Sequence, residues 1–193
     1  MADLAAAREN MVESQVRTQD VTDVRIQDAM RSVAREEVVL PTKSYLAYAD
    51  IEVEYAPGRW LLKPRDVAKL LQALRPMPGE RALAIAGPYA AAVLQLMGLS
   101  VEHVDGGDLA AAPEGTFDLI ICEGAVGRVP AAWLGALAPG GRLAVVERDG
   151  PVGKACLYLK AEVGAQSEIG RRELFDATPP VMAGLEAQHG FAF

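Results

Sequence analysis

Four side chains of types that bind metal ions lie within seven residues of this chain: Glu102, His103, Asp105 and Asp108. If the segment is a strand, His103 and Asp105 point to one face, and Glu102 points to the other. Two ligands on one face do not complete a metal site, because a structural zinc site takes four. The segment is therefore predicted to be an ordinary strand end, and no metal centre is expected.

Another carboxylate, Glu123, follows an apolar run over residues 119–122. In open α/β folds, ligands bind beyond the carboxyl ends of the parallel strands. Glu123 therefore either lines a ligand pocket or ends a strand in solvent, and the residues alone leave both interpretations open.

Several other chemistries lack their residues. No GxSxG turn is present, and His103 and His189 are the only histidines, so a Ser-His-Asp triad has no support. A nicotinamide site would need GxGxxG after the first strand, which the chain lacks. Cys122 and Cys156 form no CxxC pair and lie in apolar runs, so we expect reduced thiols and a cytoplasmic protein.

Composition narrows the class further. The chain has 193 residues, of which 51% are hydrophobic and 23% charged, enough apolar material for one well-packed domain. Nineteen basic against 26 acidic residues give a net charge of -7, so no nucleic-acid partner is predicted. We treat residues 1–193 as a single domain, with an N-terminal helical extension over 1–57 and an α/β core over 58–193.

Apolar periodicity and the positions of Gly and Pro define the elements that must carry these residues. The predicted helices are 4–17, one capped by Thr22, one opened by Pro64, 89–97 and 130–137. The predicted strands are 82–86, 101–105, 117–122, 142–147 and 155–161, with short candidates over 51–55 and 190–193. Strands that alternate with helices are typical of a doubly wound, mostly parallel sheet.

Residues 82–101 carry no charge over 20 positions, which is long enough to cross a bilayer. Gly87-Pro88 interrupts the run between a strand-like piece and an alanine-rich helix. A strand, a turn and a buried helix explain it better, so no membrane span is predicted.

In this order the segments resemble the protein-L-isoaspartate O-methyltransferase family. The N-terminal matches are Met11-Val12, Gln15-Val16-Arg17, Asp23-Val24-Arg25, Ala29-Met30, Val33, Arg35-Glu36 and Ala47-Tyr48-x-Asp50. Later matches are Gly58 and Pro64 at the spacing of the family's GQTISQP segment, Phe117-Asp118-Leu-Ile-Ile121, Val129-Pro130 and Pro139-Gly140-Gly141-Arg142-Leu143. The resemblance implies a class I methyltransferase fold, S-adenosylmethionine as donor, and methyl transfer to isoaspartyl carboxylates of damaged proteins.

The chain departs from the family where the chemistry lies. The family's GQTIS reads Gly58-Arg59-Trp60-Leu61-Leu62 here, so Leu62 stands at the serine implicated in catalysis, and no catalytic residue is assigned. The family's glycine-rich GxGxGY turn is shortened to Ala86-Gly87-Pro88-Tyr89. If a donor binds, the resemblance places Gly87 and Tyr89 against it, Asp105 on its ribose and Glu123 at the reaction space.

A deletion is the third departure. Only residues 106–116 separate Asp105 from the next strand, which is too few for a helix, a strand and two turns. We therefore expect the family's third strand and its preceding helix to be missing. Those elements form the adenine side of the family's donor pocket.

Two functions remain open. One is an S-adenosylmethionine-dependent protein carboxyl methyltransferase acting on a protein substrate. The other is a non-catalytic relative that has lost the donor and binds a protein partner, through Arg59–Leu62 or the N-terminal helices. A local excess of basic residues over 59–81 would suit an acidic partner or a carboxylate substrate.

Overall fold

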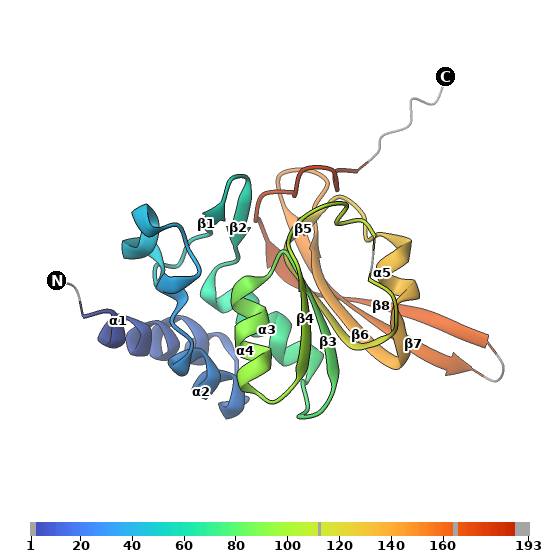
Figure 1. The fold of residues 1–193 in the computed structure, drawn as a ribbon, viewed down its shortest axis with the longest axis horizontal. Helices are drawn as coiled ribbons and strands as arrows, with labels where there is room; N and C mark the ends of the chain where they lie inside the picture. Colours follow the sequence, from blue (N-terminus) through green and yellow to red (C-terminus); the bar gives the residue numbers. More distant parts are fainter. Residues whose placement is uncertain (1–2, 112, 164–165, 188–193) are drawn as a thin grey trace, which may run out of the picture.

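A central sheet of six strands organises the chain. The computed structural model describes residues 3–111, 113–163 and 166–187, and orders the strands β4-β3-β5-β6-β7-β8 (Figure 1). Their bounds are β3 Arg81–Ile85, β4 Ser100–Val104, β5 Phe117–Val126, β6 Leu137–Glu147, β7 Gly153–Val163 and β8 Gln166–Ala177. β4, β3, β5 and β6 pair in parallel, whereas β7 and β8 are antiparallel. The predicted doubly wound, mostly parallel α/β sheet is confirmed.

Alternation along the strands builds a core on each face of the sheet. Leu119 and Ile121 of β5 pack with the helices α3 (Pro64–Leu74) and α4 (Pro88–Leu96), and Ile120 packs with Trp133 of α5 (Ala131–Gly135) on the other face. The helices α3 and α4 lie on the same side as the N-terminal segment (Figure 1). The uncharged segment over 82–101 forms β3, α4 and the start of β4, and no helix of the described residues is long and apolar enough to cross a membrane.

The edge of the sheet is at β4, as the deletion predicts. Among the described residues between Val104 and Phe117 there is neither helix nor strand, and β4 pairs only with β3. The third strand and its preceding helix, which the resemblance led us to expect missing, are therefore absent from the described residues at this edge.

The N-terminal segment is helical with interruptions. The predicted helix over 4–17 becomes α1 (Leu4–Met11), a π-helical turn (Val12–Val16) and a 3-10 turn (Arg17–Gln19). The cap predicted at Thr22 was wrong by one residue: Asp23 caps α2 (Val24–Ser32), because its carboxylate accepts from the Arg25 amide at 3.0 Å.

Residues 35–61 carry short elements, two 3-10 turns (Arg35–Glu37 and Pro41–Leu46) and a hairpin of β1 (Val53–Ala56) with β2 (Arg59–Leu61). Ile51, predicted to begin a strand, lies outside β1 and is 41% exposed. The hairpin crosses the predicted division between residues 57 and 58, and that division stays a prediction.

At the C-terminal end the sequence reasoning missed a strand. β8 pairs with β7 over its whole length. Charged residues, among them Glu168, Arg171, Arg172 and Glu173, interrupt its apolar pattern, so the sequence did not indicate a strand. The predicted helix over 130–137 is also shorter, because β6 already begins at Leu137. The strand predicted at 190–193 lies outside the described residues.

Candidate functional site

Gly87, Tyr89, Asp105 and Glu123, which we call the carboxyl-end cluster, are held at the carboxyl ends of β3, β4 and β5. The turn from β3 into α4 is tight: Ala86 has φ 47°, a left-handed conformation unusual for a residue with a side chain. Gly87 is the N-cap of α4 and Pro88 its first residue. Gly87 is buried, and a Cβ built on it would lie 3.1 Å from the Cβ of Glu123.

Glu123 lies within β5, which continues to Val126, so the expectation that it follows the strand was wrong. Its side chain is fully buried, and its Oε2 accepts from the Ala90 amide at 3.0 Å. The first amides of a helix lack partners within the helix and favour an anion. A carboxylate of the chain itself therefore occupies the anion position at the start of α4.

Arg35 faces Glu123 from the N-terminal segment. Both side chains are fully buried, with Nη1 of Arg35 3.8 Å from Oε1 of Glu123, close enough for attraction but too far for a hydrogen bond. The rest of the guanidinium is satisfied by the chain, because Nε donates to the Ala47 carbonyl at 2.7 Å and Nη2 donates to the Leu62 carbonyl. Arg35 thereby connects the segments around Ala47 and Leu62 to Glu123 of β5.

Burial perturbs the titration of both groups. It raises the pKa of Glu123 to about 7, against the opposing effects of Arg35 and of the amides of Ala90, Leu62 and Tyr89. Burial also lowers the pKa of Arg35, which Glu123 partly offsets. A perturbed carboxyl at the carboxyl end of a sheet is a typical functional-site signal, although a structural ion pair produces it as well.

Tyr89 packs beside this pair. Its ring is fully buried, with the Arg35 guanidinium 4.8 Å from its centroid, within cation–π range. The phenol oxygen, Oε1 of Glu123 and Nη1 of Arg35 are buried atoms without a hydrogen-bond partner among the described residues. Polar groups that a ligand could use are therefore present, but they are buried, and Arg35 and Glu123 face each other inside the protein.

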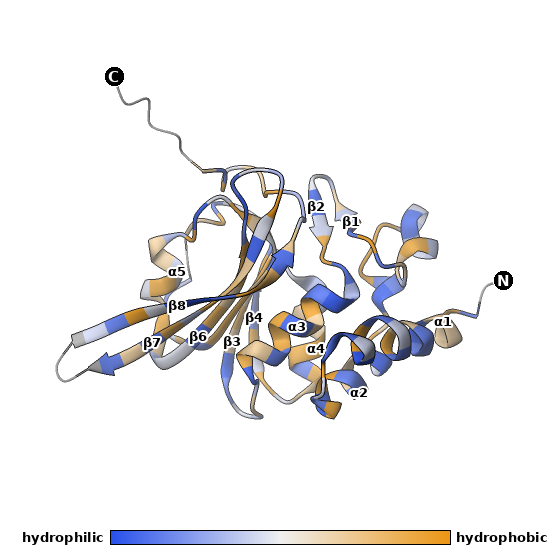
Figure 2. Cartoon of the chain, turned by 180° about the vertical axis from the view of Figure 1, so that it is seen from behind, coloured by the Kyte–Doolittle hydropathy of each residue, from blue (hydrophilic) through white to orange (hydrophobic). Residues whose placement is uncertain are grey.

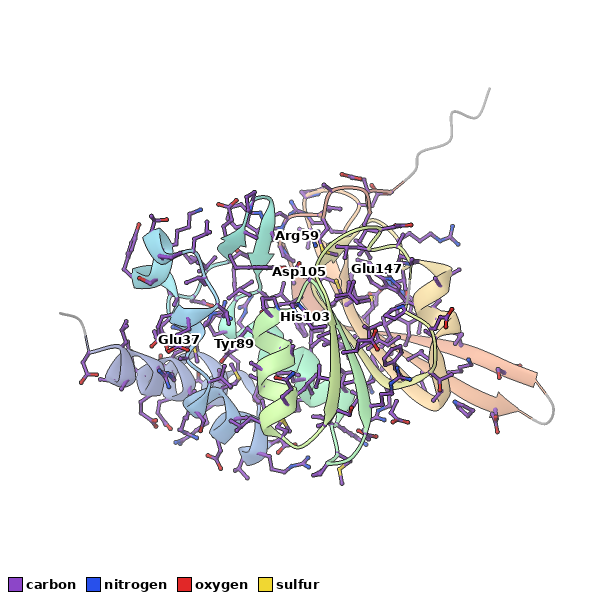
Figure 3. The ribbon with its side chains drawn as sticks, in the orientation of Figure 1. Glu37, Arg59, Tyr89, His103, Asp105 and Glu147 are labelled. Atoms are coloured by element: carbon purple, nitrogen blue, oxygen red, sulfur yellow. The ribbon has the colours of Figure 1, made fainter. Side chains whose placement is uncertain are left out.

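Asp105 directly follows β4 and is held by the β1–β2 hairpin. Its Oδ1 accepts from the Tyr55 hydroxyl at 2.7 Å and from Nη1 of Arg59 at 3.2 Å. Figure 3 shows Arg59 and Asp105 close together, with Tyr89 nearer to the N-terminal segment. Burial first, then the hydrogen bond to Asp105 and the charges of Asp105 and Glu123, raise the pKa of the Tyr55 phenol.

Neighbouring segments close this end further. Leu61 and Leu62 are fully buried, and the Met182 side chain packs against Gly124, where a Cβ would lie 3.0 Å from its sulfur. The two leucines belong to the core and cannot take part in the contact surface expected over Arg59–Leu62. Arg59 pairs with Asp105, and a contact through the partly exposed Arg59 and Trp60 stays a prediction.

The predicted basic surface is also largely neutralised. Arg59, Lys63, Arg65 and Arg81 form ion pairs with Asp105, Glu52, Asp66 and Glu102, respectively. Of the six basic residues over 59–81, Lys69 and Arg75 have no carboxylate partner among the described residues.

No three His, Cys, Asp or Glu side chains of the described residues are grouped to hold a metal ion. Glu102 pairs with Arg81 at 3.2 Å, and His103 is exposed. Cys122 and Cys156 are buried free thiols.

Comparison with solved structures defines the class of fold. The chain resembles a protein-L-isoaspartate O-methyltransferase structure from Plasmodium falciparum, in complex with S-adenosyl-L-homocysteine, with a TM-score of 0.71 at 16% identity over 91% of this chain and 97% of the other. A second protein-L-isoaspartate O-methyltransferase structure gives a TM-score of 0.67 at 21% identity over 93% of this chain and 67% of the other. The fold is that of the class I methyltransferases.

Sequence comparison narrows the class to a family. The chain is 33% identical over 184 residues to the protein-L-isoaspartate O-methyltransferase of Methylorubrum extorquens, covering 81% of this chain and 80% of the relative. It is 28% identical to the Koribacter versatilis protein of the same name, over 83% of this chain and 84% of the relative. No model of a known protein family matches the chain. The chain belongs to the protein-L-isoaspartate O-methyltransferase family.

The residues that sequence reasoning missed are the partners of the predicted ones. Tyr55 was placed in a strand by its alternation with Val53, which gave its burial but not its contact with Asp105. Arg35 stood in a motif shared with the family, and no local signal marked it as buried beside Glu123.

Proposed function

We propose that this chain is a non-catalytic member of its family that no longer binds the methyl donor and acts as a protein-binding module. The observation that carries the proposal is the Glu123 carboxylate at the start of α4, buried with Arg35 and bonded to the Ala90 amide. A donor at this turn would have to displace a buried, paired charge, which is costly.

S-adenosylmethionine does not fit the residues present. Gly87 is buried against Glu123, so the backbone at the turn has no free approach for a ligand. Asp105, the carboxylate that would hold the ribose, is paired with Tyr55 and Arg59. Among the described residues, no further strand pairs with the β4 edge to enclose an adenine. We therefore assign no step of methyl transfer to this chain.

The competing function is the activity that names the family, methyl transfer to an isoaspartyl carboxylate of a protein substrate. Family membership favours it, and it would assign Gly87, Tyr89, Asp105 and Glu123 to the donor. It requires the Glu123–Arg35 pair and the β1–β2 hairpin to open together, against the burial of both charges.

Titration with S-adenosyl-L-homocysteine separates the two functions. A ligand at about a hundred times its dissociation constant stabilises a protein by about 2.7 kcal/mol, which raises the melting temperature by about 5 to 10 °C at this chain length. We expect no shift for this chain at millimolar ligand. The Plasmodium falciparum protein, measured alongside, should shift.

A saturable rise that Asp105→Ala abolishes and Asp108→Ala leaves intact would overturn the proposal and restore the methyltransferase assignment. Asp108 is a matched control, because it is an exposed carboxylate of the same loop. Transfer of a labelled methyl group to an isoaspartyl peptide by the purified chain would overturn the proposal equally.

A further inference from the structure

A hollow in the surface lies away from the carboxyl-end cluster. A groove of about 1250 Å³ runs between the end of α3 and the strands β7 and β8. One wall carries Lys69 and Arg75, and the other carries Leu157, Leu159 and Arg172. We call this feature the ribbon groove.

The ribbon groove forms because β7 and β8 extend beyond the end of α3, which covers the sheet beside them. They have 11 and 12 residues, against five for β3 and β4, and they reach well beyond α3 (Figures 1 and 2). Leu157 and Leu159 of β7 lie opposite Arg172 and Gly170 of β8, so their side chains share one face. That face forms an apolar floor with Leu174 and Phe175.

The floor is incompletely covered by the chain. Leu159 is 44% exposed, and Met77 at the other wall is 52% exposed. Exposed apolar residues gathered in one groove, rather than scattered singly, mark an interaction site.

The rim has an excess of positive charge that the chain does not compensate. The lining contains six Lys and Arg side chains and two Asp side chains. Arg25, Arg142 and Arg171 are paired with Asp23, Glu80 and Glu147, respectively. Lys69, Arg75 and Arg172 have no carboxylate partner among the described residues, and Lys69 lies over the Phe175 ring at 4.7 Å. In a chain of net charge -7 this rim is an exception.

We propose that the ribbon groove binds an acidic, amphipathic segment of a partner protein. Apolar side chains of the segment would cover Leu159 and Leu157, and its carboxylates would pair with Arg75 and Arg172. An amphipathic segment laid in an apolar groove is a common mode of peptide recognition. This proposal names the partner class for the proposed function and rests on that function. The residues of the groove are separate from the carboxyl-end cluster.

A second copy of the chain fits the groove less well. A two-fold contact of groove on groove would bring Arg75 and Arg172 of both copies together, and like charges across an interface are unfavourable. The net negative charge of the whole chain would add to the repulsion.

Peptide selection tests this chemistry even though the partner protein is unidentified. The full chain is presented to a random library of displayed peptides, each about 16 residues long. We expect the enriched sequences to carry excess Asp and Glu with apolar residues at helical spacing. The enrichment should be lost on a chain with Arg75→Glu and Arg172→Glu. It should persist on a chain with Arg128→Glu. Arg128 is an exposed arginine that follows the carboxyl end of β5 and does not line the groove.

One enriched peptide is then titrated by fluorescence anisotropy. The double charge reversal should raise Kd about tenfold or more, and Leu159→Glu should do the same by removing the apolar floor. Arg128→Glu should change Kd by less than about twofold, and raising salt from about 50 to about 300 mM should weaken binding to the native chain. All these positions are exposed, and unchanged melting temperatures confirm that the variants fold.

Enriched peptides without acidic excess, or equal affinity for the double variant, would overturn the proposal. Self-association of the native chain that the double variant abolishes would assign the groove to a second copy instead and would overturn it as well. Donor titration reports on the carboxyl-end cluster and peptide selection on the ribbon groove, so either proposal can fail while the other stands.

Discussion

The carboxyl-end cluster and the ribbon groove differ in whether their charged side chains have partners within the chain. At the carboxyl end, Glu123 is buried with Arg35 and Asp105 accepts from Tyr55 and Arg59. In the groove, Arg75 and Arg172 have no carboxylate partner among the described residues and Leu159 is exposed. The charges at the carboxyl-end cluster have partners within the chain, and the charges of Arg75 and Arg172 beside the end of α3 do not, among the described residues.

The difference separates structural from binding roles. Removing one partner of a buried ion pair is costly, because the other charge is left buried without compensation. An exposed charge without a partner contributes little to stability and remains available for binding. Substitutions at the two regions should therefore affect different measurements.

The largest effect is expected at Arg35. Arg35→Ala should lower the free energy of unfolding by about 3 to 5 kcal/mol, because it leaves Glu123 buried without a counter-charge and the Ala47 and Leu62 carbonyls without their donor. Urea denaturation measures the loss. Arg172→Ala, in the groove, should stay within about 0.5 kcal/mol of the native chain. Similar losses at both positions would remove the distinction between the two regions.

Glu123 should make stability depend on pH. Its folded-state pKa of about 7 lies above its ordinary value of 4.5, so the folded state binds more protons between these values. The free energy of unfolding should therefore fall as the pH rises through this window, by about 3 kcal/mol in total. Glu123→Gln should remove that part of the slope in urea titrations at several pH values.

The matched control for this experiment is Glu114→Gln. Glu114 is exposed, so its variant should run parallel to the native chain across the same pH range. If the native chain and Glu123→Gln also run parallel, the Glu123 carboxyl is not perturbed by burial, and the interpretation of the cluster as a sealed ion pair is wrong.

The smallest effect concerns the turn before α4. Ala86 has φ 47°, which costs a non-glycine residue about 1 to 2 kcal/mol. Ala86→Gly should relieve that strain and lose a buried methyl group, so the two changes nearly cancel and the free energy of unfolding should change by less than about 0.5 kcal/mol. Ala92→Gly, within α4, should cost about 1 kcal/mol. Equal losses in thermal unfolding would show that the turn is not strained.

Much of the fold followed from local patterns. The strands at 82–86, 117–122 and 142–147 were predicted from apolar runs between Gly and Pro residues, and each forms at its position. β8 was not predicted, because five of its 12 positions carry charge and interrupt its apolar pattern. The start of α2 was misplaced because Thr22 and Asp23 are both good caps, and only the backbone geometry selects between them.

The sequence by itself determined that Asp105 ends one strand, that Glu123 follows the apolar run of the next strand along the chain, and that too few residues follow Asp105 for another strand before it. These features depend on order along the chain. Only the tertiary structure decided what faces them, because Arg35, Tyr55 and Arg59 come from segments distant in sequence and reach the sheet by packing. Likewise, the sequence showed the excess of basic residues over 59–81. Which of them are neutralised, and that Lys69 and Arg75 remain over an apolar groove, depends on partners that only the folded chain brings within ion-pair distance.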